Sequence, residues 1–284
     1  MADSSVHGPA SIPSLLGHTV DGELAWGPSD AVVFAAATGA APATDLDYLD
    51  LSRGPSVMPL FPGIRLARAG QHHPRWLSSF GWDEHDTFIL SSEFTIHDVA
   101  PPAAKVRWHA EIVDVWDKDS SAILVGECSA GLAGETLLTW RNSVMVRGRG
   151  GFGGERGPKR QPPPELHTAS ELDVVLPPVG AALYQLVGEH NPHSLDPGFA
   201  ADAGLPGPIT AGALLIAAAA RTITATYADG DHQALRHIRV DHAGPHIIGN
   251  PLTMLIQESD TGTLHFEVAS DGQQVLLAGH ADLN

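Results

Sequence analysis

The chain has 284 residues, of which 33 are acidic and 16 are Lys or Arg, so its formal charge is −17 at pH 7. Duplex nucleic acid and anionic lipid both need a positive contact surface, which argues against either as the main partner. One cysteine, Cys128, excludes an intramolecular disulfide, and the longest apolar run, residues 211–220, is too short to span a bilayer. The sequence shows no basic-then-apolar leader, so we expect a cytoplasmic protein with a sizeable core.

The first half of the chain predicts an antiparallel sheet with one helix. Ser29 and Asp30 can cap a short helix that runs to Ala37 and stops at Gly39. Residues 55–63 hold three prolines and are expected to be irregular. Later, apolar and polar residues alternate in a way that is typical of half-buried strands. The predicted strands cover residues 88–97, 106–112, 123–128 and 137–146.

The composition then changes abruptly. Residues 148–164 hold six glycines and four prolines in 17 positions, which predicts a connector that is flexible at first and stiffer later. We therefore expect an N-terminal unit over residues 11–147, a linker over 148–170 and a C-terminal unit over 171–284.

The second half of the chain shows the same pattern as the first, with predicted helices followed by predicted strands. Asp196 and Pro197 predict the start of a short helix that ends near Gly204. Thr210 can cap a second helix to about Thr226, which is apolar nearly all round and should be enclosed by other structure. Predicted strands follow at residues 234–242, 252–258, 264–269 and 274–281, with a hairpin turn at residues 271–272. A helix wrapped by an antiparallel sheet, twice in one chain, predicts an α+β double hot-dog fold, a pseudo-dimer within one chain.

Residues 184–212 carry the motif on which the functional prediction depends. The segment resembles the signature of the MaoC-like (R)-specific enoyl-CoA hydratase 2 family, in which Gly-Asp-x-Asn-Pro-Leu-His-x-Asp-Pro precedes Pro-Ile-Leu-His-Gly. Three other segments resemble further parts of the family's pattern: Asp117-Lys118 with the serines after it, the Gly-Gly-Phe-Gly-Gly run in residues 147–154, and residues 243–250. The resemblance implies a hydro-lyase that adds water to an enoyl thioester, or removes it from a 3-hydroxyacyl thioester.

That reaction needs a base near the water, a proton donor near C2 and a donor for the enolate-like oxygen. By the resemblance, Glu189 replaces the family's catalytic Asp, and Ser194 and Ala211 stand where the family has histidines. The resemblance thus implies Glu189 as acid/base, with Asn191 and Ser194 positioning the water or hydroxyl and the Gly212 amide as oxyanion donor. His190 and His193 flank this segment, and His193 is either the catalytic imidazole or an ordinary hydrogen-bonded histidine.

The resemblance also implies substrate contacts and no cofactor or metal. The expected substrate-binding residues are Tyr184, Asp196, Pro208, Ile209, Thr210, Ala211, Arg147 and Arg149. The two arginines, with Arg156, Lys159 and Arg160, either meet the phosphates of coenzyme A or belong to a solvated connector. Met58, Leu60, Phe61 and Ile64 either line an acyl tunnel or pack in the core. The histidine pair at residues 72–73 and the acidic cluster at 83–86 are interpreted as solvated loops.

Two other functions are open because the family's imidazoles are missing. One is an inactive or scaffolding hot-dog subunit, and the other is a repurposed isomerase or cyclase of a specialised acyl pathway. The expected partners are an acyl-CoA or an acyl-carrier-protein thioester, and a homodimer or a second hot-dog subunit is allowed.

Overall fold

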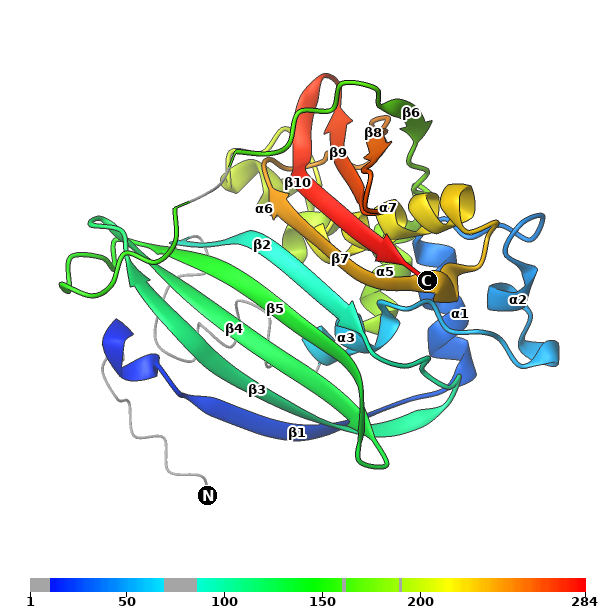
Figure 1. Cartoon of the computed structure of the whole chain (residues 1–284), viewed down its shortest axis with the longest axis horizontal. Coiled ribbons are helices and arrows are strands. Elements are labelled where there is room, and N and C mark those ends of the chain that lie inside the picture. Colours follow the sequence, from blue (N-terminus) through cyan, green and yellow to red (C-terminus); the bar gives the residue numbers. More distant parts are fainter. Residues whose placement is uncertain (1–10, 69–85, 160–161, 189–190) are drawn as a thin grey trace.

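The computed structural model describes residues 11–68, 86–159, 162–188 and 191–284 (Figure 1). Ten antiparallel strands form one curved sheet in the order β1-β3-β4-β5-β2-β7-β10-β9-β8-β6. The strands are β1 (Thr19–Trp26), β2 (Thr87–Ile96), β3 (Ala104–Asp117), β4 (Ser121–Leu132), β5 (Glu135–Arg147), β6 (Ser170–Asp173), β7 (Leu235–His242), β8 (Thr253–Glu258), β9 (Leu264–Ser270) and β10 (Gln273–Leu283).

The helices gather on the inner face of this sheet (Figure 1). The α-helices are α1 (Pro28–Ala37), α2 (Leu46–Leu49), α3 (Phe61–Arg68), α5 (Gly180–Val187), α6 (Pro197–Asp202) and α7 (Gly212–Tyr227). Short 3₁₀ turns complete the description: η1 (Ile12–Leu15), η2 (Leu51–Arg53), η4 (Pro192–Ser194) and η5 (His232–Ala234).

The sheet consists of two five-stranded halves that meet at one seam. β2 from the N-terminal half pairs with β7 from the C-terminal half, with Ser91 opposite Asp241 and Thr95 opposite His237. Each half curves around helical structure, so the predicted double hot-dog fold is confirmed. The seam matters for function because it places residues about 150 positions apart in sequence opposite one another on β2 and β7.

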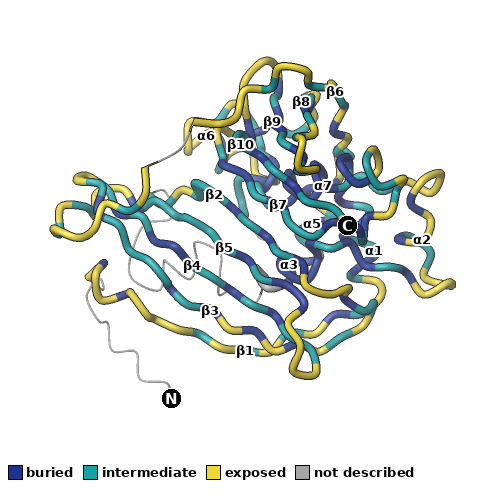
Figure 2. Tube along the Cα trace, in the orientation of Figure 1, coloured by how far each residue is buried: buried dark blue, intermediate teal, exposed yellow. Residues whose placement is uncertain are grey.

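The predicted strands all form, and their alternation shows why. In β3, Val106, Trp108, Ala110 and Ile112 are buried while the residues between them are more exposed. The predicted turn at residues 271–272 joins β9 to β10, with Asp271 and Gly272 both at positive φ, as a type I′ hairpin requires. Two strands were not predicted: β1, which lies at the sheet edge and is largely exposed (Figure 2), and β6.

The helices differ from the prediction in several places. α1 begins at Pro28 with Gly27 as its N-cap residue, and Asp30 accepts the hydrogen bond from the Gly27 amide at 2.9 Å. Residues 55–63 are not irregular throughout, because α3 begins at Phe61 and packs on β1, β4 and β5. α5 was not predicted, and it packs against α1.

One continuous core links the two halves of the chain. It joins Trp26, Phe61 and Trp140 of the N-terminal half to the buried face of α7 and to Phe266 of β9. Arg65 of α3 adds a polar link, because its guanidinium donates to the carbonyl oxygens of Ala25 and Val187. Val187 is the last residue of α5, so α3 fixes the backbone within the first part of the motif segment.

The first part of the connector is exposed, as predicted, but it is anchored by hydrogen bonds, which corrects the prediction that it is flexible. The Asp117 carboxylate accepts hydrogen bonds from the amides of Gly151 and Gly153 at 2.8 and 2.7 Å, and these bonds hold its pKa below the usual range against a smaller opposing effect of burial. A Cβ at Gly150 would lie 2.5 Å from backbone atoms of Asp119 and Ser121. The glycines therefore allow close backbone packing on the β3–β4 turn.

Candidate functional site

The candidate site is centred on the start of α7, the long buried helix. Ala211 is its N-cap residue and makes no side-chain cap hydrogen bond. The first amides of a helix have no intrahelical acceptor, and the helix dipole is positive at this end. The amides that begin with Gly212 are therefore suited to hold a developing negative charge.

Thr210 does not cap α7, contrary to the sequence prediction. Its hydroxyl pairs with Nδ1 of His246 at 2.8 Å, and its amide donates to the His246 carbonyl oxygen at 2.9 Å. His246 is buried, and its Nε2 also donates to the carbonyl oxygen of Asn250 at 3.0 Å. This arrangement makes His246 a structural group that fixes the backbone ahead of Gly212.

A short turn, η4, lies against the same lead-in segment. Asn191 is its N-cap residue, and its Oδ1 pairs with the amide of His193 at 3.0 Å and with Nδ1 of the same ring at 2.8 Å. The carbonyl oxygen of His193 accepts from the amide of Ile209 at 2.9 Å. The structure therefore brings residues 191–194 and 208–212 together, as the family motif implies.

Ser194, which stands where the family has a histidine, is buried in this structure. The residue is 2 % exposed, and its Oγ has no hydrogen-bond partner among the described residues. His193 points its ring edge-on to Phe199, with ring centroids 4.7 Å apart. Because Asn191 already holds Nδ1 of His193, this ring is a hydrogen-bonded part of the turn, and its catalytic role stays a prediction.

An imidazole that the sequence interpretation missed lies directly beside Gly212. A Cβ built on Gly212 would be 2.7 Å from Cε1 and 3.1 Å from Nδ1 of His242, the last residue of β7. Nε2 of His242 is 3.1 Å from the hydroxyl of Ser92 on β2, across the seam. The only sequence signal was position, since His242 directly precedes the family-like residues 243–250.

The surroundings of His242 keep it neutral at physiological pH. The ring is half-buried, and burial lowers its pKa to about 4, although the neighbouring carboxylate of Asp241 acts in the opposite direction. A neutral imidazole has one nitrogen that donates and one that accepts a proton. His242 is thus available as a proton acceptor at the start of α7.

Other predicted substrate contacts have structural partners. The Asp196 carboxylate caps α6 by accepting from the amides of Gly198 and Phe199 at 2.8 and 3.1 Å. Tyr184 is fully buried, with its ring 6.5 Å from that of Phe34. Pro208 accepts from the amide of Ile248 at 3.0 Å.

The predicted basic patch belongs to a different part of the fold. Arg147 lies at the end of β5, where its guanidinium is 3.5 Å from Asp86 and lies over the Phe88 ring. Arg149 is exposed in the connector, and Arg156 forms a two-bonded pair with Asp119 at 2.7 and 2.9 Å.

Several predictions fall on residues that the structure does not describe. Glu189 and His190, the histidine pair at residues 72–73, residues 83–85 and Arg160 all lie outside the described residues. In the ranges that are described, no group of three or more His, Cys, Asp and Glu side chains is arranged to hold a metal ion. No helix there is both long enough and apolar enough to cross a bilayer.

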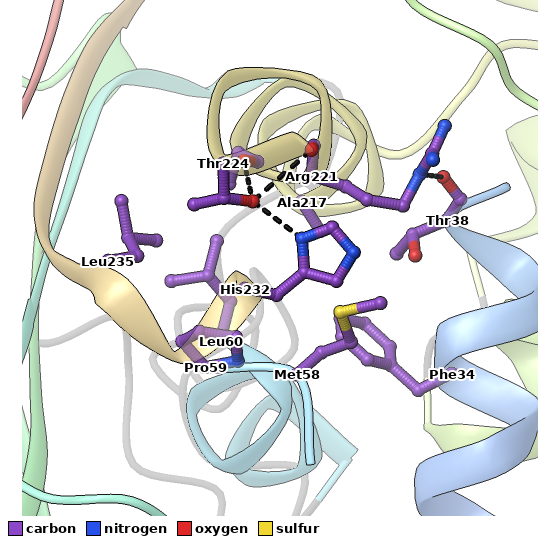
Figure 3. Close-up of a pocket in the computed structure, with 11 residues that line it drawn as sticks. Phe34, Thr38, Met58, Pro59, Leu60, Ala217, Arg221, Thr224, His232 and Leu235 are labelled. Atoms are coloured by element: carbon purple, nitrogen blue, oxygen red, sulfur yellow. Dashed lines mark hydrogen bonds between the residues drawn. The ribbon is translucent and has the colours of Figure 1, made fainter. Parts of the chain in front are cut away.

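The expected acyl tunnel residues are core residues in this structure. Phe61 and Ile64 are fully buried, while Met58 and Leu60 face a cavity of about 10 Å³ against Ala217 of α7 (Figure 3). That volume is near the minimum for one water molecule. A larger cleft of about 210 Å³ adjoins the start of α7, lined by Thr210, Leu214, His246 and apolar residues of the segments around 174–181 and 248–252.

The small cavity adjoins a polar cluster that resembles a catalytic triad in geometry. Nδ1 of His232 lies 2.6 Å from Oγ1 of Thr224 (Figure 3). On the other side of the ring, Nε2 lies 2.6 Å from Oδ1 of Asp45. The side chains of Asp45 and His232 are 2 % and 1 % exposed, and they lie by Thr224 in the C-terminal half of α7, at the other end of the helix from Gly212. We interpret the cluster as a buried hydrogen-bond network that joins the segment after α1 to the end of α7.

A ten-stranded sheet of two halves encloses the buried helix α7, and the uncapped start of that helix lies beside the turn at residues 191–194. This arrangement defines a double hot-dog protein. Comparisons with known proteins agree. A MaoC like domain model matches residues 157–275. The chain is 31% identical over 246 residues to "Enoyl-CoA hydratase ChsH3" of Mycobacterium tuberculosis, covering 82% of this chain and 83% of the relative. It is 32% identical over 198 residues to "3-hydroxyacyl-thioester dehydratase Y" of the same organism, covering 65% and 67%.

The solved structures confirm the fold. A MaoC-like dehydratase from Phytophthora capsici superposes with a TM-score of 0.81 at 17% identity and covers 97% of this chain and 98% of its own. With these sequence matches, the chain belongs to the MaoC-like hydratase and dehydratase family.

Proposed function

We propose that this chain is a hydro-lyase that adds water to an enoyl thioester or removes it from a 3-hydroxyacyl thioester. The names of its relatives support the reaction class, because one is called an enoyl-CoA hydratase and another a 3-hydroxyacyl-thioester dehydratase. Both names describe the same equilibrium read in opposite directions.

The observation that carries the proposal is the uncapped start of α7 at Gly212. Attack of water at C3 of an enoyl thioester moves negative charge onto the thioester oxygen. A backbone amide at a helix start stabilises that charge, and a residue without a side chain lets the thioester approach closely. Asn191 and Ser194 lie on the turn that packs against the same lead-in segment, so a reacting C3 can lie near them.

The proton transfers need an acid/base group, for which the family motif supplies Glu189. Its carboxylate has the family's charge on a side chain that is one methylene longer. A hydroxyl is no base near neutral pH, so Ser194 serves by holding the water. Asn191 holds the turn through its contacts with His193, which keeps Ser194 in place.

The pantetheine thioester comes from coenzyme A or from a carrier protein, and these sources are distinguished by the assay. Purified protein is incubated with enoyl thioesters of increasing chain length on each carrier, and loss of the conjugated enoyl absorbance is followed. Turnover on at least one substrate supports the proposal. Turnover that survives Glu189→Gln would remove Glu189 from the mechanism, and Glu171→Gln, an exposed carboxylate of β6, is the matched control.

A scaffolding subunit is the second candidate, and one observation favours it. The two positions at which the family has histidines hold Ser194 and Ala211, and both are buried. A folded protein that turns over no enoyl thioester of any length, but co-purifies with a second hot-dog protein, would support this function instead.

A further inference from the structure

We infer that His242 supplies the imidazole of this active site and carries the proton between water and C2 of the acyl chain. The inference rests on the proposed hydro-lyase function. It adds a residue that the family motif does not contain and that comes from a different element, the end of β7.

The first support is the position of the ring. His242 occupies the space that a side chain at residue 212 would fill, with Cε1 2.7 Å and Nδ1 3.1 Å from the built Cβ. A thioester whose oxygen accepts from the Gly212 amide places its C2 one bond from the carbonyl carbon. The imidazole therefore lies next to the atoms between which a proton must move.

The second support is the way the ring is oriented. Ser92 is buried on β2, and its hydroxyl meets Nε2 of His242 at 3.1 Å across the seam between the two halves. When Nε2–H donates to the Ser92 oxygen, Nδ1 is left as the acceptor on the side that faces Gly212. Ser92 is thus a positioning residue that fixes the orientation of the ring.

The third support is the electrostatic setting. Burial lowers the pKa of His242, so the neutral, proton-accepting form dominates at physiological pH. The protonated form is correspondingly a better proton donor than an ordinary imidazolium, which favours return of the proton to carbon. Asp241, the adjacent acidic residue, is itself paired with Arg239 at 3.0 Å.

The step balances with His242 as the single proton carrier, which refines the role proposed for Glu189: its carboxylate keeps the water oriented and does not take the proton itself. Nδ1 of the neutral ring accepts a proton from water while the water oxygen bonds to C3. The π pair of the C2–C3 bond then moves toward C1, and the resulting enolate oxygen accepts from the Gly212 amide. The imidazolium returns the same proton to C2, the thioester carbonyl re-forms, and hydroxyl and hydrogen now stand on C3 and C2. Dehydration is the reverse sequence.

A purely structural interpretation is that the Ser92–His242 bond only ties the two halves together. The two interpretations differ in what added imidazole does. Removal of the side chain in His242→Ala leaves a space at the site, into which free imidazole can diffuse and act as the missing base.

The experiment compares wild type, His242→Ala and His109→Gln in enoyl-thioester hydration. His109 is an exposed residue of β3 that pairs with Asp21, and its substitution is expected to leave kcat unchanged. We expect His242→Ala to lose about 10²-fold or more in kcat with a small change in KM, and added imidazole to restore part of it in a saturable way. Thermal unfolding shows whether each variant is folded.

The results distinguish failure of the proposed function from failure of the role inferred for His242. An inactive wild type would overturn the proposed function itself. With an active wild type, a folded His242→Ala that keeps its kcat, or loses it without any rescue by imidazole, would overturn the role of His242. If His242→Ala does not fold, His242→Asn replaces it, because the amide can still bond to Ser92 but cannot hold a proton, and a folded Asn variant with unchanged kcat would also overturn the inference.

Discussion

Oδ1 of Asp45 and Nε2 of His232 lie 2.6 Å apart in the core, although the two residues are 187 positions apart in sequence. Oδ2 of Asp45 also lies 3.7 Å from the guanidinium of Arg221, and it accepts from the amide of Ala41. The cluster ties the segment after α1 to the C-terminal half of α7, the helix whose first residues form the candidate site. The hydrogen bonds and the ion pair of this cluster therefore stabilise the position of α7.

Removal of the Asp45 carboxylate is expected to destabilise the protein strongly. Asp45→Ala removes the buried acceptor of His232 and the counter-ion of Arg221, a change that typically costs about 3–5 kcal/mol. Asp47→Ala is the control, because Asp47 is exposed and its pair with Arg53 at 3.6 Å is worth at most about 1 kcal/mol. Urea unfolding measures both. Equal losses for the two variants would show that the buried cluster contributes no more than a surface pair.

The stability of the fold is expected to fall on acidification below the ordinary histidine range. Burial lowers the pKa of His242 to about 4 and also lowers the pKa values of His232, His246 and His280. An unfolded histidine titrates near ~6.5, so between that pH and the folded pKa the unfolded chain binds more protons. His242 alone then removes about 3 kcal/mol of stability between about pH 6.5 and 4.

The contribution of His242 can be isolated by substitution. His242→Asn has no proton to gain, so its unfolding free energy should fall less than that of wild type between about pH 7 and 4.5. The titration of Asp45 does not overlap with that of His242. Burial raises the pKa of Asp45, but its hydrogen bonds lower the pKa by more, so the stability that Asp45 contributes is lost only at lower pH. Parallel curves for wild type and His242→Asn would show that the imidazole is not desolvated as described.

Alternation and turn residues predicted the strands of both halves, because each strand buries one face on the shared core. β1 was missed although its exposed and half-buried residues alternate, because Gly22 interrupts the apolar side and Trp26 is the one buried residue of this edge strand. α3 was hidden by the proline at residue 62, which falls within its first turn. The Gly-rich connector was misinterpreted as free because nothing local shows that Asp117, more than 30 residues earlier, accepts its amides.

The site was predictable only where it follows a local motif. The turn at residues 191–194 and the helix start at Gly212 belong to one contiguous stretch, and the structure places them together. His242 belongs to no such stretch, because its closeness to Gly212 and Ser92 depends on the pairing of β2 with β7. Apart from the place of His242 directly before residues 243–250, the sequence gives no signal for contacts of that kind.

Gly212→Ala is expected to reduce activity far more than stability. The added Cβ would lie 2.7 Å from Cε1 of His242, so the ring or the helix start must move. A displacement of ~1 Å at a reacting group can cost about 10²-fold, whereas alanine is otherwise favoured in a helix. Gly207→Ala is the control, because its Cβ would make an ordinary contact of 3.5 Å with Ile247. Comparable kcat/KM values for the two variants would contradict the closeness of His242 to the reacting atoms.

Ser194→Ala separates a hydroxyl that binds water from one that supports the fold. The Oγ is buried without a partner among the described residues, and an unsatisfied buried hydroxyl costs about 1–3 kcal/mol, so its removal should leave the free energy of unfolding unchanged or higher. Activity should nevertheless fall by about tenfold or more, because the water at C3 loses its hydrogen-bond partner.

Ser270→Ala is the matched control for this substitution. Ser270 lies at the end of β9 and is also buried with an unpartnered Oγ in the described part of the chain, but it belongs to neither the motif turn nor the start of α7. Both variants should behave alike in urea unfolding, and only Ser194→Ala should lose kcat. If Ser194→Ala is destabilised and keeps its kcat, the hydroxyl has a structural partner instead of a water, and the turn at residues 191–194 then contributes geometry alone to the site.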